Sequence, residues 1–217
     1  TKLVELPLKK VTMIRGSGTD LSEYYPTQLP KGTPIILMAS RLLVDKGVRE
    51  FVQSAQILRK RGLLEKNARF VVVGKPDIDN PHSLLPEELT QWEKEGIVEF
   101  WGYRSDMPHV IASSHLVILP SYYGEGLPKV LIEAAACGRA VITTDHPGCR
   151  DAIISGKTGI LVPIKDTKSI IKGIKTLFKS RVIYENMSRE ARYLALKKYD
   201  VKDVVRKHIE IYDQLIN

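Results

Sequence analysis

Two glutamates with seven residues between them, Glu125 and Glu133, stand on either side of a Gly-Leu-Pro turn. The apolar segment 128–138 that follows the turn is typical of a helix, which Pro128 can begin because its missing N–H costs nothing there. Free amides around residues 126–129 would then point outward with the positive end of the helix dipole and favour a phosphate. Carboxylates accept pairs of hydrogen bonds from vicinal sugar hydroxyls. The pattern therefore fits a nucleotide-sugar, whereas a helix-capping acid plus a surface glutamate explains it equally well.

A second candidate group is the segment "SRLLVDKG" at residues 40–47. Arg41 leaves an apolar run and Lys46 opens the next helical segment, with Asp45 expected as the N-cap. Two cations at such a junction can neutralise a diphosphate. A solvated arginine and lysine are the plain alternative.

A third candidate is the glycine-rich turn "RGSGTD" at residues 15–20. Gly16 and Gly18 would let the backbone approach a ligand closely. The turn is not a GxGxxG fingerprint and lacks the acidic residue that a dinucleotide site needs. An ordinary turn explains it as well.

Short apolar runs alternate along the chain with longer amphipathic segments, which predicts βαβ units and a Rossmann-like parallel sheet with helices on both faces. A further strand is expected where residues 9–26 run into the glycine turn. Strands are predicted at 34–40, 69–74, 97–102, 116–120, 140–144 and 159–163, and helices at 46–62, 87–96, 106–114, 128–138, 149–154, 167–179, 181–198 and 201–216.

The candidate residues follow the ends of these predicted strands. Ligands of open parallel sheets bind beyond the carboxyl ends of the strands. If these residues served only to pack the fold, they would not need to gather at one edge of the sheet. Those that do so are Arg41, Gly74, Lys75, Gly102, Tyr103, Arg104, Pro120, Ser121, Tyr122, Thr144, Asp145 and His146.

The composition is that of an ordinary globular protein with a basic surface. The 217 residues are 43% hydrophobic and 27% charged, with a formal net charge of +8. No apolar run is long enough for a transmembrane helix, and no signal peptide is visible. Cys137 and Cys149 lack zinc-site spacing. The absence of nucleic-acid-binding motifs argues against a nucleic-acid partner, while anionic lipid remains compatible with the charge.

Several motifs in order resemble the retaining glycosyltransferases of family 4, above all those that build bacterial surface polysaccharides. They are "SRLLVDKGVREFV", "VVVG", "VEFWGYRSDM", "VILPS", "GEGLPKVLIEAAACG" and "TTDHPGCRDAI...GKTGILVP", and the resemblance covers residues 11–215. It implies a GT-B fold, in which two Rossmann-like domains face a cleft. Residues 1–217 match one such domain, the C-terminal donor-binding half, and the N-terminal acceptor domain is expected to be absent.

The resemblance also assigns roles to individual residues. Arg41 and Lys46 match the basic pair on the donor diphosphate, Glu125 the glutamate near the sugar hydroxyls, and Glu133 the one on the ribose. The catalytic set is thus Arg41, Lys46 and Glu125. The expected donor-binding set is Gly16, Gly18, Tyr103, Arg104, Gly126, Leu127, Pro128, Lys129 and Glu133. Tyr103 and Arg104 lie where the family's backbone meets the base, and "GSGTD" stands where many members have Asn-Gly-Val-Asp.

The implied reaction transfers a hexose or N-acetylhexosamine from a UDP-linked donor to a saccharide or lipid-linked saccharide. Cations and the helix end would stabilise the leaving diphosphate, so neither a metal nor a cofactor is expected. Expected partners are the nucleotide-sugar, the N-terminal domain, a lipid-linked acceptor and the membrane surface, at the cytoplasmic face. The alternatives are a noncatalytic nucleotide-sugar-binding subunit, a sugar-nucleotide epimerase, a sugar phosphorylase and, on charge alone, a nucleic-acid binder.

Overall fold

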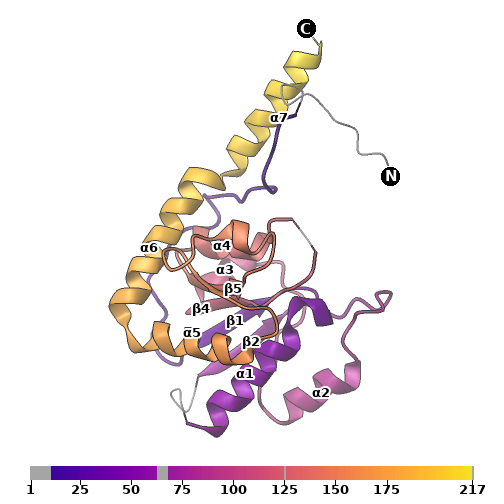
Figure 1. The fold of residues 1–217 in the computed structure, drawn as a ribbon, viewed down its shortest axis with the longest axis vertical. Helices are drawn as coiled ribbons and strands as arrows, with labels where there is room; N and C mark the ends of the chain where they lie inside the picture. The colour runs from indigo at the N-terminus through magenta and orange to yellow at the C-terminus, as the bar shows by residue number, and fades with distance from the viewer. Residues whose placement is uncertain (1–10, 63–67, 125, 217) are drawn as a thin grey trace.

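The computed structural model describes residues 11–62, 68–124 and 126–216, and these contain a six-stranded sheet of order β3-β2-β1-β4-β5-β6 (Figure 1). All neighbouring strands in it are parallel. The predicted Rossmann-like sheet is therefore confirmed. Its strands are β1 (Ile35–Ala39), β2 (Arg69–Val73), β3 (Glu99–Phe100), β4 (Leu116–Leu119), β5 (Ala140–Thr144) and β6 (Ile160–Val162).

Helices cover both faces of the sheet. The β1-to-β2 and β4-to-β5 crossovers run in opposite directions across the sheet, so right-handed connections place α1 and α4 on opposite faces. Helix α5 packs against α1, and α6 packs against α4. The helices are α1 (Val48–Lys60), α2 (Pro86–Lys94), α3 (Met107–Ala112), α4 (Lys129–Ala136), α5 (Thr167–Lys179), α6 (Arg181–Lys198) and α7 (Val201–Ile216), with 3-10 turns η2 (Val44–Lys46) and η3 (Arg150–Ala152).

The core forms where the apolar pattern predicted it. Helix α1, which the sequence places at 46–62, buries an apolar stripe that includes Phe51, Val52 and Leu58 against the sheet. The central strands are buried on both faces, as their continuous apolar runs require. Asp166 caps α5 by accepting a hydrogen bond from the Ser169 amide, so this helix begins at the predicted residue.

Three local predictions differ from the structure. Residues 11–18 form no strand, because Gly16 and Gly18 both have positive φ. This segment contacts the turn before α4 and the α6–α7 junction and does not pair with a neighbouring strand. Edge strand β3 is only two residues long, and Gly102 at φ 65° ends its extended course. The helix expected at 149–154 is the single turn η3.

Helix α7 extends away from the sheet-containing body (Figure 1). None of its described residues is buried. Its exposed apolar side chains include Val205, Ile209, Tyr212 and Ile216, which repeat at helical spacing and form one face. No helix within residues 11–62, 68–124 and 126–216 is both long and apolar enough to cross a bilayer.

Candidate functional site

The carboxyl ends of the parallel strands meet at one edge of the sheet and bring the predicted residues to it. Arg41 lies two residues beyond β1, and Lys75 lies two beyond β2. The Gly74 amide donates to the Gly102 carbonyl at 2.8 Å, which brings the ends of β2 and β3 together. The gathering predicted from the strand-end rule is confirmed, and the segment 120–123 after β4 completes the edge.

Segment 41–47 is locked to the loop after β4. The Tyr122 amide donates to the Asp45 carbonyl at 2.9 Å, and the Ser121 hydroxyl donates to the same oxygen at 3.3 Å. Gly47 adopts φ 80°, and a Cβ there would lie 2.2 Å from the Pro120 carbonyl oxygen. Only glycine permits this approach. The basic pair is therefore held next to the segment 120–123 that follows β4.

The ring of Tyr123 contacts both of the cations that are predicted to bind the diphosphate. The Lys46 Nζ is 4.6 Å from the centroid of its ring, and the Arg41 Cζ is 5.8 Å from it. Lys46 is only 6% exposed, whereas the Arg41 side chain is 51% exposed. Contacts between a cation and a ring face fix the position of the charge without neutralising it. Tyr123 thus presents two cations at one place on the sheet edge.

A loop after β2 covers the basic segment. Asp77 accepts a 2.9 Å hydrogen bond from Arg41 Nη1, and this contact raises the arginine pKa above its ordinary value. The expectation that Asp45 caps α1 is wrong: Gly47 occupies the N-cap, and the Asp45 carboxylate lies 2.6 Å from His82 Nδ1. Asp45 contacts the loop because η2 places it before the helix begins.

Glu133 occupies the second turn of α4 and is only 5% exposed. Burial raises the pKa of its carboxyl group, while a hydrogen bond from Tyr24 and the charge of Lys129, 3.8 Å away, lower it. The alternative of a surface glutamate is therefore wrong. A carboxylate this deeply buried, with the Lys129 ammonium at the limit of ion pairing, is unfavourable for folding.

The start of α4 differs slightly from the prediction. Pro128 is the N-cap, with φ −65° and ψ 123°, so Lys129 is the first helical residue. No described side chain caps this helix end. The amide groups of the first turn remain suited to an anion, as the sequence predicts.

The glycine turn is split between two places. A Cβ on Gly16 would lie 2.9 Å from Leu127 Cδ2, so Gly16 contacts the turn before α4. A Cβ on Gly18 would lie 2.8 Å from the Cα of Val201, which places Gly18 against the α6–α7 junction. Gly126 has open space around it. Glu125 lies outside the described residues, so its role remains a prediction.

The residues assigned to base recognition lie beyond β3. Tyr103 is 73% exposed, and Lys75 Nζ lies 5.9 Å from its ring centroid. Arg104 forms a bidentate pair with Asp106 at 2.7 and 2.5 Å, and this lowers the pKa of Asp106 to about 2. The Arg104 guanidinium is therefore engaged within its own loop, and the assignment of residues 103 and 104 to the base remains a prediction.

Sequence reasoning missed several residues at this edge. Tyr123 and Asp77 follow β4 and β2, so the strand-end rule extended by four residues would have found both. Lys165 follows β6 in the same way, and its Nζ lies 4.6 Å from the Tyr122 ring centroid. Tyr24 carries no such signal, because only the tertiary fold brings it to Glu133.

Comparison with known proteins places the chain in a family. Residues 25–193 match the family model described as glycosyl transferases group 1. The chain is 30% identical, over 95% of its length and 55% of the relative's, to the N,N'-diacetylbacillosaminyl-diphospho-undecaprenol alpha-1,3-N-acetylgalactosaminyltransferase of Campylobacter jejuni. It is 23% identical, over 93% of its length and 54% of the relative's, to the Escherichia coli UDP-Gal:alpha-D-GlcNAc-diphosphoundecaprenol alpha-1,3-galactosyltransferase.

Solved structures share the fold. Anabaena HepE in complex with UDP-glucose superposes with a TM-score of 0.80 at 20% identity, over 93% of this chain and 57% of that one. The C-terminal domain of LpcC from Francisella tularensis superposes with a TM-score of 0.69 at 21% identity, over 84% of this chain and 99% of that one. The present chain spans about half the length of the curated relatives named above. Because the family model matches residues 25–193, well over half of the chain, the chain belongs to the group 1 glycosyl transferases.

Proposed function

We propose that the chain is the donor-binding half of a retaining glycosyltransferase that takes a sugar from a UDP-linked hexose or N-acetylhexosamine. The observation that carries the proposal is the arrangement of Arg41 and Lys46 around Tyr123, in the segment that leads from β4 toward α4. The buried Glu133 lies on the same helix, one turn further on. Diphosphate and hydroxyl groups are the ligand chemistry that this set of cations, amides and carboxylate matches.

In this proposal the protein stabilises the leaving group. Arg41, Lys46 and the first-turn amides of α4 would receive the negative charge that grows on the diphosphate as the glycosidic bond breaks. Glu133 would accept hydrogen bonds from the ribose, and Glu125 from the donor sugar. The departing diphosphate would take the proton of the acceptor hydroxyl on the same face, so retention would need no protein nucleophile.

The acceptor would be bound by a second domain. The chain spans about half of each of the relatives named above, and the exposed apolar face of α7 is suited to packing against a further body. Those relatives carry diphospho-undecaprenol in their names, so we propose a lipid-linked saccharide acceptor at the cytoplasmic membrane surface. The 217 residues alone would bind donor weakly and transfer little sugar.

Calorimetric titration with UDP, GDP, UDP-GlcNAc, UDP-GalNAc, UDP-glucose and GDP-mannose tests the proposal. We expect saturable binding of the uridine ligands, weakened at least about tenfold in Glu133→Ala because a buried acceptor of ribose hydrogen bonds is lost. Glu93→Ala, which removes an exposed glutamate on α2, serves as the matched control and should bind as the wild type does.

Absence of binding to all six ligands would refute the proposal for this chain, as would equal binding by wild type and Glu133→Ala. Preferential binding of GDP or GDP-mannose would support the donor site but would show that the donor carries guanine and not uracil. Addition of the second half of the enzyme, with product analysis, would separate transfer from epimerisation.

A further inference from the structure

Helix α5 carries an unusual distribution of charge. Its residues Thr167–Lys179 include four lysines, at positions 168, 172, 175 and 179, and no aspartate or glutamate. Spacings of three and four place these lysines on neighbouring turns of one side of the helix. Like charges at that spacing destabilise a helix, and an exposed face built only for solubility would mix both signs. The stability of α5 therefore does not explain the row.

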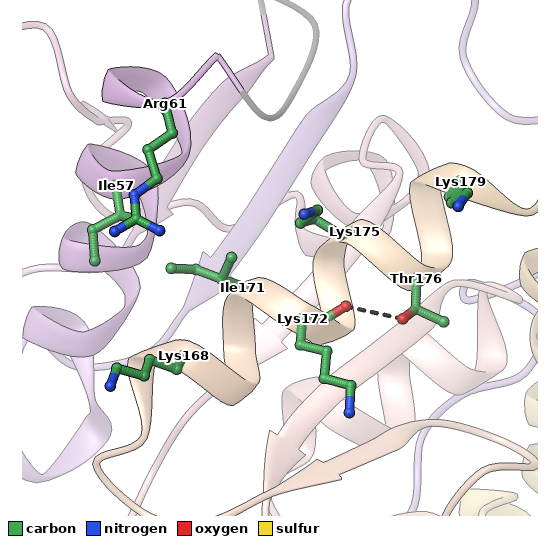
Figure 2. A pocket seen from close by; sticks show the side chains of 8 residues that line it. All are labelled: Ile57, Arg61, Lys168, Ile171, Lys172, Lys175, Thr176 and Lys179. Atoms are coloured by element: carbon green, nitrogen blue, oxygen red, sulfur yellow. Dashed lines mark hydrogen bonds between the residues drawn. The ribbon is translucent and has the colours of Figure 1, made fainter.

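The lysines border a groove between α5 and α1. The groove has a volume of about 470 Å³ and is lined by apolar and cationic residues, with Arg61 contributed from beyond the end of α1. Figure 2 shows Ile171 of α5 pointing toward Ile57 and Arg61 across this groove. We call Arg61, Lys168, Lys172, Lys175 and Lys179 the α5 ridge.

Among residues 11–62, 68–124 and 126–216, no carboxylate forms an ion pair with the α5 ridge. All five of its side chains are exposed. Asp166, next to the start of the ridge, is hydrogen-bonded to Ser169 as the helix cap. The ridge therefore presents a concentrated positive field over an apolar floor.

We propose that the α5 ridge binds the anionic surface of a lipid bilayer. Lysines act as point charges toward lipid phosphates without needing fixed geometry, and their row along about 16 Å of helix can lie on a flat surface. The aliphatic stems of the lysines, together with Ile57 and Ile171, are suited to the boundary between lipid headgroups and acyl chains. No aromatic residue lines the groove for base stacking, which disfavours single-stranded nucleic acid.

The inference rests on the proposed function in one respect, because a lipid-linked acceptor requires the enzyme to work at a membrane. Bilayer binding through α5 would hold the donor-binding half at the surface where that acceptor lies. The ridge begins at Lys168, six residues beyond the carboxyl end of β6, so it starts near the edge of the sheet that carries the candidate site.

Co-sedimentation of the 217-residue chain with vesicles tests the inference. Vesicles of phosphatidylcholine with about one-third phosphatidylglycerol, at about 0.1 M salt, would be compared with vesicles of phosphatidylcholine alone. We expect binding to the anionic vesicles only. The double variant Lys172→Gln and Lys175→Gln should weaken it by about thirty-fold, the effect of two membrane-facing lysines.

The matched control is the double variant Lys202→Gln and Lys207→Gln, which removes the same charge from exposed positions on α7, separated from the ridge by the length of α6 (Figure 1). It should bind anionic vesicles within about twofold of the wild type, since charges beyond a Debye length are screened. Circular dichroism melting would establish that both variants are folded. Equal weakening by the two double variants, or equal binding of wild type to the two vesicle types, would overturn the inference.

Two further measurements separate the explanations. Tighter binding to a random RNA or DNA duplex than to anionic vesicles, lost in the ridge variant, would also overturn the bilayer assignment. Calorimetric titration with UDP on the same samples should give unchanged affinity in the ridge variant. Absence of UDP binding by the wild-type chain would refute the proposed function. Binding of the same chain to anionic vesicles would still support the bilayer assignment of the α5 ridge.

Discussion

Burial of the Glu133 carboxylate in its ionised form destabilises the folded state. Its carboxyl group is buried beside Tyr24, and the burial raises its pKa from the ordinary 4.5. The folded state therefore keeps the proton at a pH where the unfolded chain has released it. Stability falls as pH rises from about 4.5 through the raised native value, and the deprotonated carboxylate stays unfavourable above it.

The first prediction is that Glu133→Gln stabilises the fold while it weakens donor binding. The amide keeps the shape and the hydrogen bond with Tyr24 but carries no charge to desolvate. Thermal melting at pH 8 should give a higher midpoint for the variant, and the difference should disappear below about pH 4.5. A variant that melts lower at pH 8 would contradict this account of Glu133.

Asp77 occupies a position that the proposed ligand would need. It pairs with Arg41 at 2.9 Å on an exposed loop, and a donor diphosphate would compete for the same guanidinium. The second prediction is that Asp77→Asn tightens UDP binding about two- to fivefold, the value of an exposed ion pair. Calorimetry at two salt concentrations measures it, and the gain should shrink in high salt.

Asp79→Asn is the control for Asp77, since Asp79 is an exposed carboxylate of the same loop. It should leave UDP affinity unchanged. Weaker binding by Asp77→Asn would show instead that Asp77 positions Arg41 for its ligand.

Among the elements, the junction of η2 and α1 decides where the cations lie. Gly47 allows segment 41–47 to pack against Pro120, and its φ of 80° joins η2 to α1. The row of apolar residues in α1 holds the helix to the sheet, but the glycine determines how the preceding turn leaves it. Gly47 therefore affects both the packing of α1 and the positions of Arg41 and Lys46.

The third prediction compares two glycines of similar backbone conformation. Gly47→Ala should lower the free energy of unfolding by about 3 kcal/mol or more, because strain from positive φ adds to a clash with the Pro120 carbonyl. Gly62→Ala, at φ 57° with open space around it, should cost only about 1 kcal/mol. Urea denaturation measures both, and equal losses would contradict the proposed close packing.

At the scale of the molecule, α7 contributes little to the body that contains the sheet. Its described residues are not buried, and the Val201 amide joins it to the rest by a hydrogen bond to the Thr19 carbonyl at 3.1 Å. The apolar face of α7 is exposed in this chain. The stability of the body that contains the sheet is therefore expected to depend little on α7.

The fourth prediction is that a chain ending at Val204 stays folded. Its melting midpoint should change by about 2 °C or less, and its UDP affinity by about twofold or less, because the removed residues bury no side chain in the described body. Differential scanning calorimetry and titration measure these values. Cooperative unfolding of the shortened chain at room temperature would show that α7 supports the fold.

The main elements of the fold could be predicted because each leaves a local pattern. Helices α5, α6 and α7 begin and end at the predicted residues, since apolar spacing and capping residues mark them. The parallel sheet follows from runs that are apolar on both faces. Residues 11–18 were predicted wrongly because a short apolar run next to glycines does not say whether a neighbouring strand exists to pair with it.

The sequence by itself determined the order of strands and helices, and through it the edge at which Arg41 and Lys46 gather, because the carboxyl ends of parallel strands must share one edge. Only the tertiary structure decided which side chains meet there. Tyr24 packs against Glu133, and the Tyr123 ring contacts both cations, through contacts that no local pattern encodes. The lack of described ion pairs along the α5 ridge likewise depends on what the fold places opposite it.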